Sequence, residues 1–200
     1  MAPPFFAARA LSCARNGEKC ETIGHMSVIA RESLSLAKWQ RLLIRGYRLG
    51  FALLATIALV VQYADSSQIS GFSAVNFFSY FTILSNILGA VVLLWAAFSY
   101  RRSEALDYVR GAAAAYLAVT GLVFALLLAD ESESLGMLYP WVDGIVHELM
   151  PLVVIFDWLL VPPIARLGLR RTWWWLAFPI SYVAYSLLRG QLLIGIRTLF

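Results

Sequence analysis

The chain has 200 residues, of which 60% are hydrophobic and 14% are charged, and its net charge is +4. Soluble domains are about 45–50% apolar and about 25% charged, so this composition excludes an ordinary soluble globular protein. The small positive charge does not indicate nucleic-acid binding, because the basic residues stand beside apolar segments, where they orient membrane proteins.

Apolar runs of about 20 residues predict an all-α, polytopic membrane bundle of five transmembrane helices. The tail, residues 1–36, has no sustained period and is predicted to be disordered, and the bundle is predicted to cover residues 37–190. Residues 191–200 are too few to cross a bilayer and are predicted to form a C-terminal tail. The predicted spans are residues 44–63, 72–98, 109–129, 139–161 and 173–188.

The charges between the spans predict the orientation. Basic residues precede the first span and follow the second and the fourth, whereas the links after the first and third spans are acidic or neutral. This asymmetry predicts a multi-pass protein of the cell membrane with a cytoplasmic N-terminus. The basic segment before the first span contains Lys38, Arg41, Arg45 and Arg48. The predicted charged loop after the second span contains Arg101, Arg102, Glu104, Asp107 and Arg110, and the acidic loop contains Asp130, Glu131 and Glu133.

Residues 76–86, in the second predicted span, carry six hydrogen-bonding side chains within an apolar run. On a continuous helix, four of these side chains project within roughly 120° of one another. They are Asn76, Ser79, Thr82 and Asn86. Lipid cannot satisfy such a stripe, so we expect it to face protein or a water-lined cavity. Polar stripes of this kind often serve only helix–helix hydrogen bonding, and that interpretation stays open.

The fourth predicted span contains the only histidine of the predicted spans, His147. His147 lies roughly 12 Å and Thr82 roughly 15 Å below the ends of their spans on the same side of the membrane. Asp143 is one turn before His147, close enough to orient its ring. Pro151 lacks the amide that would bond the His147 carbonyl, so we expect a kink or a bound water there. Ionisable groups inside a bilayer are costly and usually functional.

The fifth predicted span adds Tyr182, Tyr185 and Arg189 on one stripe. A pocket that opens outward, with hydroxyls at its base and a cation near its mouth, would suit an amphiphile that bears a carboxylate. Packing of the two tyrosines and interfacial anchoring by Arg189 are the alternatives.

The remaining ionisable and metal-binding residues point to structural roles. Cys13 and Cys20 lack the C-x-x-C spacing, and the chain has only two histidines, so neither a metal nor a haem cofactor is expected. Asp157 lies near the predicted inner interface and is expected to pair with Arg166 or Arg170.

Three motifs resemble those of a bacterial group of integral membrane proteins, the Pr-six-Pr type. They are N-F-F-S-Y-F-T-x-x-S-N at 76–86, D-x-x-x-H-x-x-x-P-x-x-x-x-x-D-W at 143–158 and P-x-S-Y-x-x-Y-S-x-x-R-G at 179–190. The resemblance covers about residues 40–190. This group is remotely similar to the eukaryotic androgen-induced membrane protein family, through the membrane threonine and histidine.

The eukaryotic family includes threonine hydrolases that cleave fatty acid esters of hydroxy fatty acids. The resemblance implies that Thr82 is the nucleophile and that His147 is its base. It also implies a sixth span near the C-terminus, a pattern that the ten residues after Gly190 do not match.

The first hypothesis is therefore a membrane-embedded hydrolase of lipid esters, with Asn76, Ser79, Asn86 or a tyrosine hydroxyl as the donor to the oxyanion. A non-catalytic membrane protein that binds a lipid or small molecule would use the same pocket without turnover. The third hypothesis is a structural membrane subunit, whose polar stripe seals an interface within the bundle or between subunits. Membrane lipids are the expected partners, nucleic acid is not, and the sequence leaves the oligomeric state open.

Overall fold

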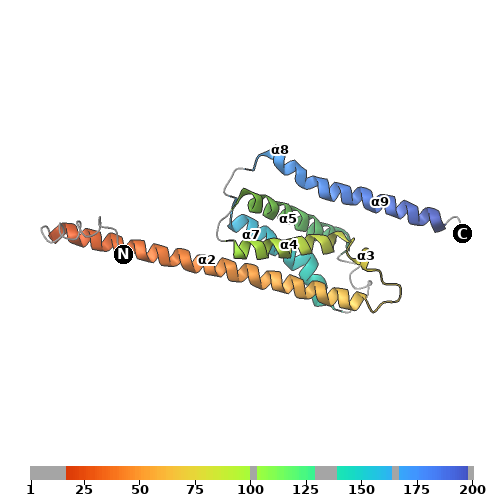
Figure 1. Cartoon of the computed structure of the whole chain (residues 1–200), viewed down its shortest axis with the longest axis horizontal. Coiled ribbons are helices and arrows are strands. Elements are labelled where there is room, and N and C mark those ends of the chain that lie inside the picture. The colour runs from red at the N-terminus through yellow and green to blue at the C-terminus, as the bar shows by residue number, and fades with distance from the viewer. Residues whose placement is uncertain (1–16, 100–102, 129–138, 164–166, 198–200) are drawn as a thin grey trace. The chain divides into compact units, whose positions relative to one another are not determined.

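A computed structural model describes the backbone of residues 17–99, 103–128, 139–163 and 167–197. Across these ranges the chain forms helices joined by turns, and no strand is present in them (Figure 1). The predicted all-α class is confirmed. The chain divides into two units, Met1–Ile44 and Arg45–Phe200, and the bundle described below lies within the second.

The described residues up to 123 form one long helix, one short helix and two helices of intermediate length. They are α2 (Gly17–Ser66), α3 (Ala74–Phe77), α4 (Phe81–Phe98) and α5 (Glu104–Val123). A π-helical turn, η1 (Phe124–Leu128), continues directly from α5. The predicted acidic loop that follows, together with Arg101 and Arg102, lies outside the described residues.

The described residues from 139 onward form two composite helical segments, and in each of them the helix geometry changes along the chain. The first runs without a break through α6 (Pro140–Gly144), the π-helical turn η3 (Ile145–Leu149) and α7 (Met150–Leu160). The second runs through α8 (Leu169–Thr172), the 3-10 turn η4 (Trp173–Leu176) and α9 (Ala177–Arg197). The helix α9 extends past the predicted end of the fifth span at residue 188.

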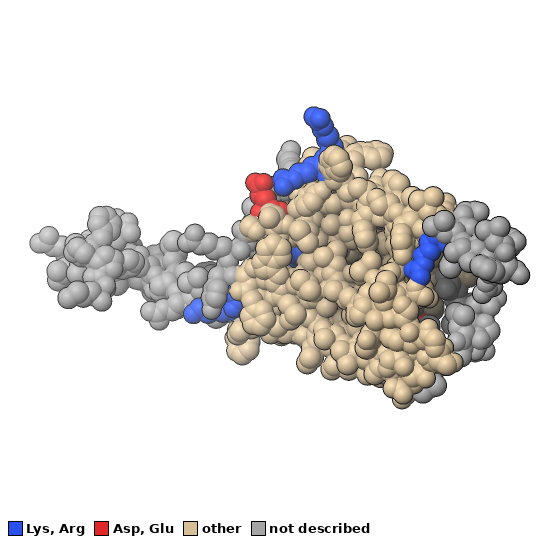
Figure 2. Space-filling model, turned by 45° about the vertical axis from the view of Figure 1, so that its right-hand side comes forward, with Lys and Arg blue, Asp and Glu red and all other residues tan. Residues whose placement is uncertain are grey.

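Three described helical stretches are long and apolar enough to cross a membrane: Lys38–Ser66, Phe81–Phe98 and Glu104–Leu127. Their presence indicates a multi-pass membrane protein. Figure 2 shows a face of the molecule on which uncharged residues cover a broad middle region and charged side chains stand at its edges. Residues 17–36, predicted as part of a disordered tail, belong to α2, whereas residues 1–16 lie outside the described ranges.

The predicted second span, residues 72–98, is not one helix. Between α3 and α4 the backbone of Tyr80 is extended, with φ −71° and ψ 134°. The Ser79 hydroxyl donates to the Val75 carbonyl at 2.6 Å. The same kind of bond occurs inside continuous helix at Thr56 of α2 and Thr120 of α5, so it accompanies the break at Tyr80 and does not by itself explain it.

The break divides the polar stripe that a continuous helix would have presented. Asn76 and Ser79 lie before it, and Thr82 and Asn86 lie after it on α4. The prediction that all four side chains share one helical face is therefore wrong.

The core of the bundle forms where α4, α5 and α7 pack side by side and α2 joins them (Figure 1). Ala52 and Ala55 of α2 are fully buried, and small residues of this kind let neighbouring helices approach closely. Leu93, Leu117 and Met150 are the largest apolar side chains buried between them. This packing fixes the positions of α4 and of the α6–α7 path, which carry Thr82 and His147.

The predicted charged loop before the third span is largely helical. Glu104, Asp107 and Arg110 belong to the first turns of α5, so their prediction as loop residues is wrong. The Ser103 hydroxyl accepts the Leu106 N–H at 3.2 Å and caps this helix. Acidic residues in a first turn also interact favourably with the helix dipole.

Asp157 binds two buried arginines from other helices. Its carboxylate lies 2.6 Å from Nε of Arg48 on α2 and 2.7 Å from Nη2 of Arg110 on α5. Arg110 also contacts Asp107 at 3.0 Å, and all four side chains are buried. The predicted pairing of Asp157 with Arg170 is wrong, because Asp157 binds Arg48 and Arg110, and Arg166 lies outside the described residues. Arg48 is an inward-facing residue rather than part of an interfacial basic segment. We call these four residues the buried charge cluster.

Gly111 is predicted to be a site where one added methyl group destabilises the protein. A Cβ at this position would lie 2.6 Å from Cζ2 of Trp175 and 3.0 Å from Cη2 of Trp158. We expect Gly111→Ala to lower the free energy of unfolding by about 1–3 kcal/mol, because overpacking displaces the indole rings. Thermal unfolding in detergent micelles measures this. Gly50→Ala on α2, which would meet no atom within 4 Å, is the control and should leave the melting temperature unchanged or higher. Equal melting temperatures for both variants would contradict the packing described.

Candidate functional site

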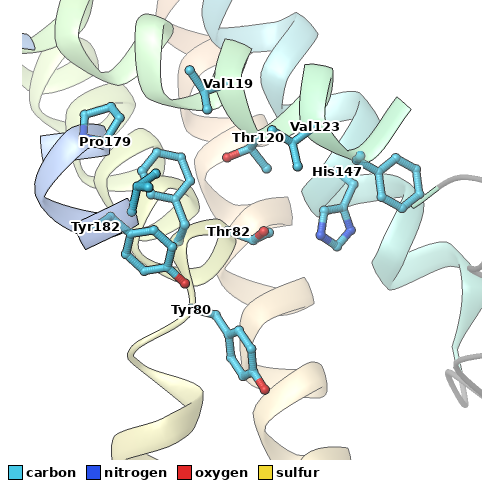
Figure 3. A pocket seen from close by; sticks show the side chains of 11 residues that line it. Tyr80, Thr82, Val119, Thr120, Val123, His147, Pro179 and Tyr182 are labelled. Atoms are coloured by element: carbon cyan, nitrogen blue, oxygen red, sulfur yellow. The ribbon is translucent and has the colours of Figure 1, made fainter. Parts of the chain in front are cut away.

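A cavity of about 340 Å³ lies within the second unit, between the start of α4, the end of α5 with η1, the turn η3 and α9 (Figure 3). Its walls are mostly apolar, with Phe81, Val119 and Val183 among them. Five lining side chains carry polar atoms: Tyr80, Thr82, Thr120, His147 and Tyr182. A concave, mostly apolar site with a few convergent polar groups is the usual form of a binding site for a small or lipidic ligand.

Thr82 and His147, predicted to lie at similar depth, both line this cavity. Thr82 stands in the first turn of α4, immediately after the break at Tyr80, and His147 stands in η3. In the view of Figure 3, Thr82 lies between Tyr182 and His147. Within the described part of the chain, no hydrogen bond joins the Thr82 hydroxyl to the His147 ring. Such contacts are often long without a ligand and tighten in the complex with substrate.

The His147 ring is held on two sides. Nδ1 lies 2.6 Å from Oδ1 of Asp143, as the spacing of four residues predicted. The ring of Phe124 stacks on it, with the centroids 4.6 Å apart and the planes 12° from parallel. When Nδ1 carries the proton and donates it to Asp143, Nε2 is left as an acceptor. Nε2 of His147 can then accept a proton from a group in the cavity.

The predicted distortion at Pro151 is confirmed, as a π turn. The Met150 N–H bonds to the Ile145 carbonyl, five residues back, so the helix is wider by one residue over η3. Pro151 has no N–H with which to continue the α-helical pattern. Because π turns reorient the side chains that they contain, this distortion helps to set the direction of His147.

A polar cleft of about 320 Å³ adjoins the cavity, and the two share Tyr80 and Tyr182 as lining residues. In it, Nη1 of Arg189 donates to the Tyr185 hydroxyl at 3.0 Å, and that hydroxyl donates to Ser79 at 3.5 Å. The predicted site residues that line this cleft and not the cavity are Asn76, Ser79, Tyr185 and Arg189. The structure thus divides the predicted site into an apolar cavity with Thr82 and His147 and a polar cleft with Arg189.

Asn86 lines neither the cavity nor the cleft. Its Nδ2 atom donates to the carbonyls of Thr82 and Val146, each at 2.9 Å. Both amide hydrogens are therefore used, and Asn86 has none to offer an oxyanion. The expected role of Asn86 as an oxyanion donor does not fit this geometry.

Sequence reasoning missed Phe124 and Tyr80. Phe124 stands in an apolar run. The sequence of such a run does not distinguish an aromatic residue that stacks on a histidine from one that packs against leucine. Tyr80 was part of the polar motif, but its place between the cavity and the cleft depends on the extended backbone at this residue. Thr120 pairs with Ser85 at 2.9 Å at the edge of the cavity, across two helices.

Comparisons with known proteins give no further assignment. No family model matches the chain, and no curated protein or solved structure matches it. Within the described residues, no group of three His, Cys, Asp or Glu side chains could hold a metal ion. Function is therefore inferred from the chain's own residues.

Proposed function

We propose that the chain crosses the cell membrane five times, with a cytoplasmic N-terminus. In addition to the three long apolar helices, the continuous path from Pro140 to Leu160 extends about 30 Å at about 1.5 Å per residue, the thickness of a hydrocarbon core. The helix α9 has 21 residues, which also suffices. The arrangement of basic residues between the spans supports the orientation.

Within this bundle, we propose a threonine-nucleophile hydrolase of lipid esters. The observation that carries the proposal is that Thr82 and His147, from different helices, line one apolar cavity while Asp143 holds Nδ1 of the histidine. A threonine hydroxyl becomes a useful nucleophile when a nearby base takes its proton. The expected resemblance of the motifs to the bacterial Pr-six-Pr group, which is remotely similar to a family with threonine hydrolases, points in the same direction.

In the proposed reaction, Oγ1 of Thr82 attacks the ester carbonyl carbon while its proton passes to Nε2 of His147. The bond to the alcohol oxygen breaks, the alcohol leaves with the proton from His147, and the acyl group stays on Thr82. A water molecule then attacks the acyl carbon and gives a proton to His147. The carboxylic acid is released as the Thr82 oxygen takes that proton back.

The oxyanion of each tetrahedral intermediate needs a donor in the cavity. The Tyr182 hydroxyl is the candidate that we favour. Tyr182 lines the cavity and, in the view of Figure 3, lies on the side of Thr82 opposite to His147. The cleft beyond Tyr80 and Tyr182, with Arg189, would receive the polar end of a substrate whose apolar part fills the cavity.

The test is hydrolysis of a fluorogenic oleate ester by the purified protein in lipid nanodiscs. We expect Thr82→Ala to reduce the rate to that of nanodiscs without protein, because no nucleophile remains. Thr56→Ala is the matched control: its hydroxyl bonds to the Ala52 carbonyl at 2.8 Å, and it lines a different groove. Full activity of Thr82→Ala would exclude the proposed nucleophile.

A second candidate is a protein that binds an apolar ligand without turnover. The mostly apolar walls of the cavity favour it, together with the lack of a direct hydrogen bond between Thr82 and His147 in the described structure. It predicts that a fluorescent fatty acid binds wild-type protein and Thr82→Ala equally, while neither hydrolyses the ester.

A further inference from the structure

The helical segment that carries His147 departs from the α-helical hydrogen-bond pattern at η3. The Met150 N–H bonds to the Ile145 carbonyl, in the π pattern. The next residue, Pro151, is buried and has no N–H. The carbonyl of Val146 is therefore left without a donor from its own helix, because Met150 is engaged elsewhere and Pro151 cannot donate.

Asn86, on α4, supplies that donor. Its Nδ2 atom lies 2.9 Å from the Val146 carbonyl and 2.9 Å from the Thr82 carbonyl, and its side chain is fully buried. An amide nitrogen carries two hydrogens, so each carbonyl receives one. One side chain thereby joins the backbone of Thr82 to the backbone of the residue that precedes His147.

The orientation of this amide is fixed by its partners. The reversed amide would place Oδ1 against two carbonyl oxygens, which is unfavourable. In the observed orientation Oδ1 is buried and has no hydrogen-bond partner among the described residues, a cost that a leucine of similar size would avoid. The gain that offsets this cost is the link between the two backbones.

The helix α5 supports the same turn from another direction. A Cβ at Gly121 would lie 3.3 Å from the His147 carbonyl oxygen and 3.1 Å from Cβ of Pro151, so α5 packs directly on η3. Phe124, in η1, stacks on the His147 ring. The turn is thus held by α5 and tied to α4 by Asn86.

We propose that Asn86 is a positioning residue, which sets the distance and angle at which the Thr82 hydroxyl and the His147 ring meet. This inference rests on the proposed function. Asn86 acts on the two backbones and does not contact the substrate, since both of its amide hydrogens are already bonded to carbonyls.

The test compares Asn86→Leu with Val92→Ala, which removes buried apolar atoms from the same helix, away from the cavity. Labelling by an alkyl fluorophosphonate is measured at a temperature at which each variant is folded. We expect Asn86→Leu to lower the maximal labelling rate about 100-fold at an unchanged half-saturating probe concentration, because a misplacement of about 1 Å can cost that factor. Val92→Ala should label at the wild-type rate. A wild-type rate for Asn86→Leu would overturn the proposal.

A second measurement is independent of the chemistry. The double variant Thr82→Cys with His147→Cys, in a Cys13→Ser and Cys20→Ser background, is treated with a short bifunctional thiol reagent. We expect efficient cross-linking that falls several-fold when Asn86→Leu is added. If Asn86→Leu lowers cross-linking but the fluorophosphonate never labels the wild-type protein, the proposed hydrolase activity is excluded. The role of Asn86 in positioning Thr82 and His147 is then retained. Unchanged cross-linking after Asn86→Leu would remove the positioning role, whatever the labelling shows.

Discussion

Asp157→Ala is expected to lower the free energy of unfolding by about 3–5 kcal/mol, the usual cost of removing one partner from a buried ion pair. Arg48 and Arg110 both bind this carboxylate, at 2.6 and 2.7 Å, and neither side chain is more than 9% exposed. Without Asp157, two guanidinium groups would stay buried with fewer acceptors. The effect should be large because the buried charge cluster joins α2, α5 and α7 at one point.

Reversible unfolding in mixed detergent micelles measures this loss. The matched control is Glu104→Gln, since Glu104 and Arg171 form an exposed ion pair at 3.7 Å, whose loss should cost at most about 1 kcal/mol. Equal stabilities of Asp157→Ala and Glu104→Gln would show that the cluster contributes little to the bundle.

His147→Ala is expected to reduce ester hydrolysis by about 10²–10⁴-fold, the range over which a positioned base contributes. The reason is that Thr82 would lose the group that takes its proton, whereas the apolar walls of the cavity would remain. The measurement is the rate of hydrolysis of the fluorogenic oleate ester at saturating substrate.

Asp143→Asn tests whether the tautomer of His147 matters for the reaction. The amide of the variant can donate to Nδ1 of His147, which would move the ring proton to Nε2 and leave no base on the cavity side. A loss of rate approaching that of His147→Ala is expected, with unchanged binding of a fluorescent fatty acid. Wild-type rates in both variants would contradict the role of the histidine.

Features that depend on local spacing could be predicted from the sequence. Asp143 and His147 are four residues apart, and the structure brings them to 2.6 Å. Pro151 lacks an amide, and the helix departs from α geometry just before it. Thr82 and His147 line one cavity, although the count along a continuous helix that suggested their matching depth does not hold across the break at Tyr80.

Features that depend on the rotation and pairing of helices could not be predicted in this way. Arg48 and Arg110 stand near the ends of apolar segments, where the positive-inside rule makes basic residues look like interfacial groups. Both instead turn inward to Asp157, a pairing across more than 40 residues that no local pattern encodes.

The break at Tyr80 had the largest effect on the predicted site. Continuous apolar sequence predicts continuous helix, and nothing in the composition of the run marks Tyr80 as the residue where the backbone becomes extended. The break places Ser79 in the polar cleft and Thr82 in the apolar cavity. The role of Asn86 was missed for a related reason, because its partner at Val146 loses a donor only through the π turn.

We propose that Thr82 is a nucleophile that His147 activates inside one cavity. The most direct test of this proposal is to label the purified protein with an alkyl fluorophosphonate and to locate the adduct by mass spectrometry of its peptides. We expect one adduct, on Thr82, that is formed by the wild-type protein and by Thr56→Ala and is lost in His147→Ala. An adduct on another residue, or labelling of Thr82→Ala at the wild-type rate, would contradict it.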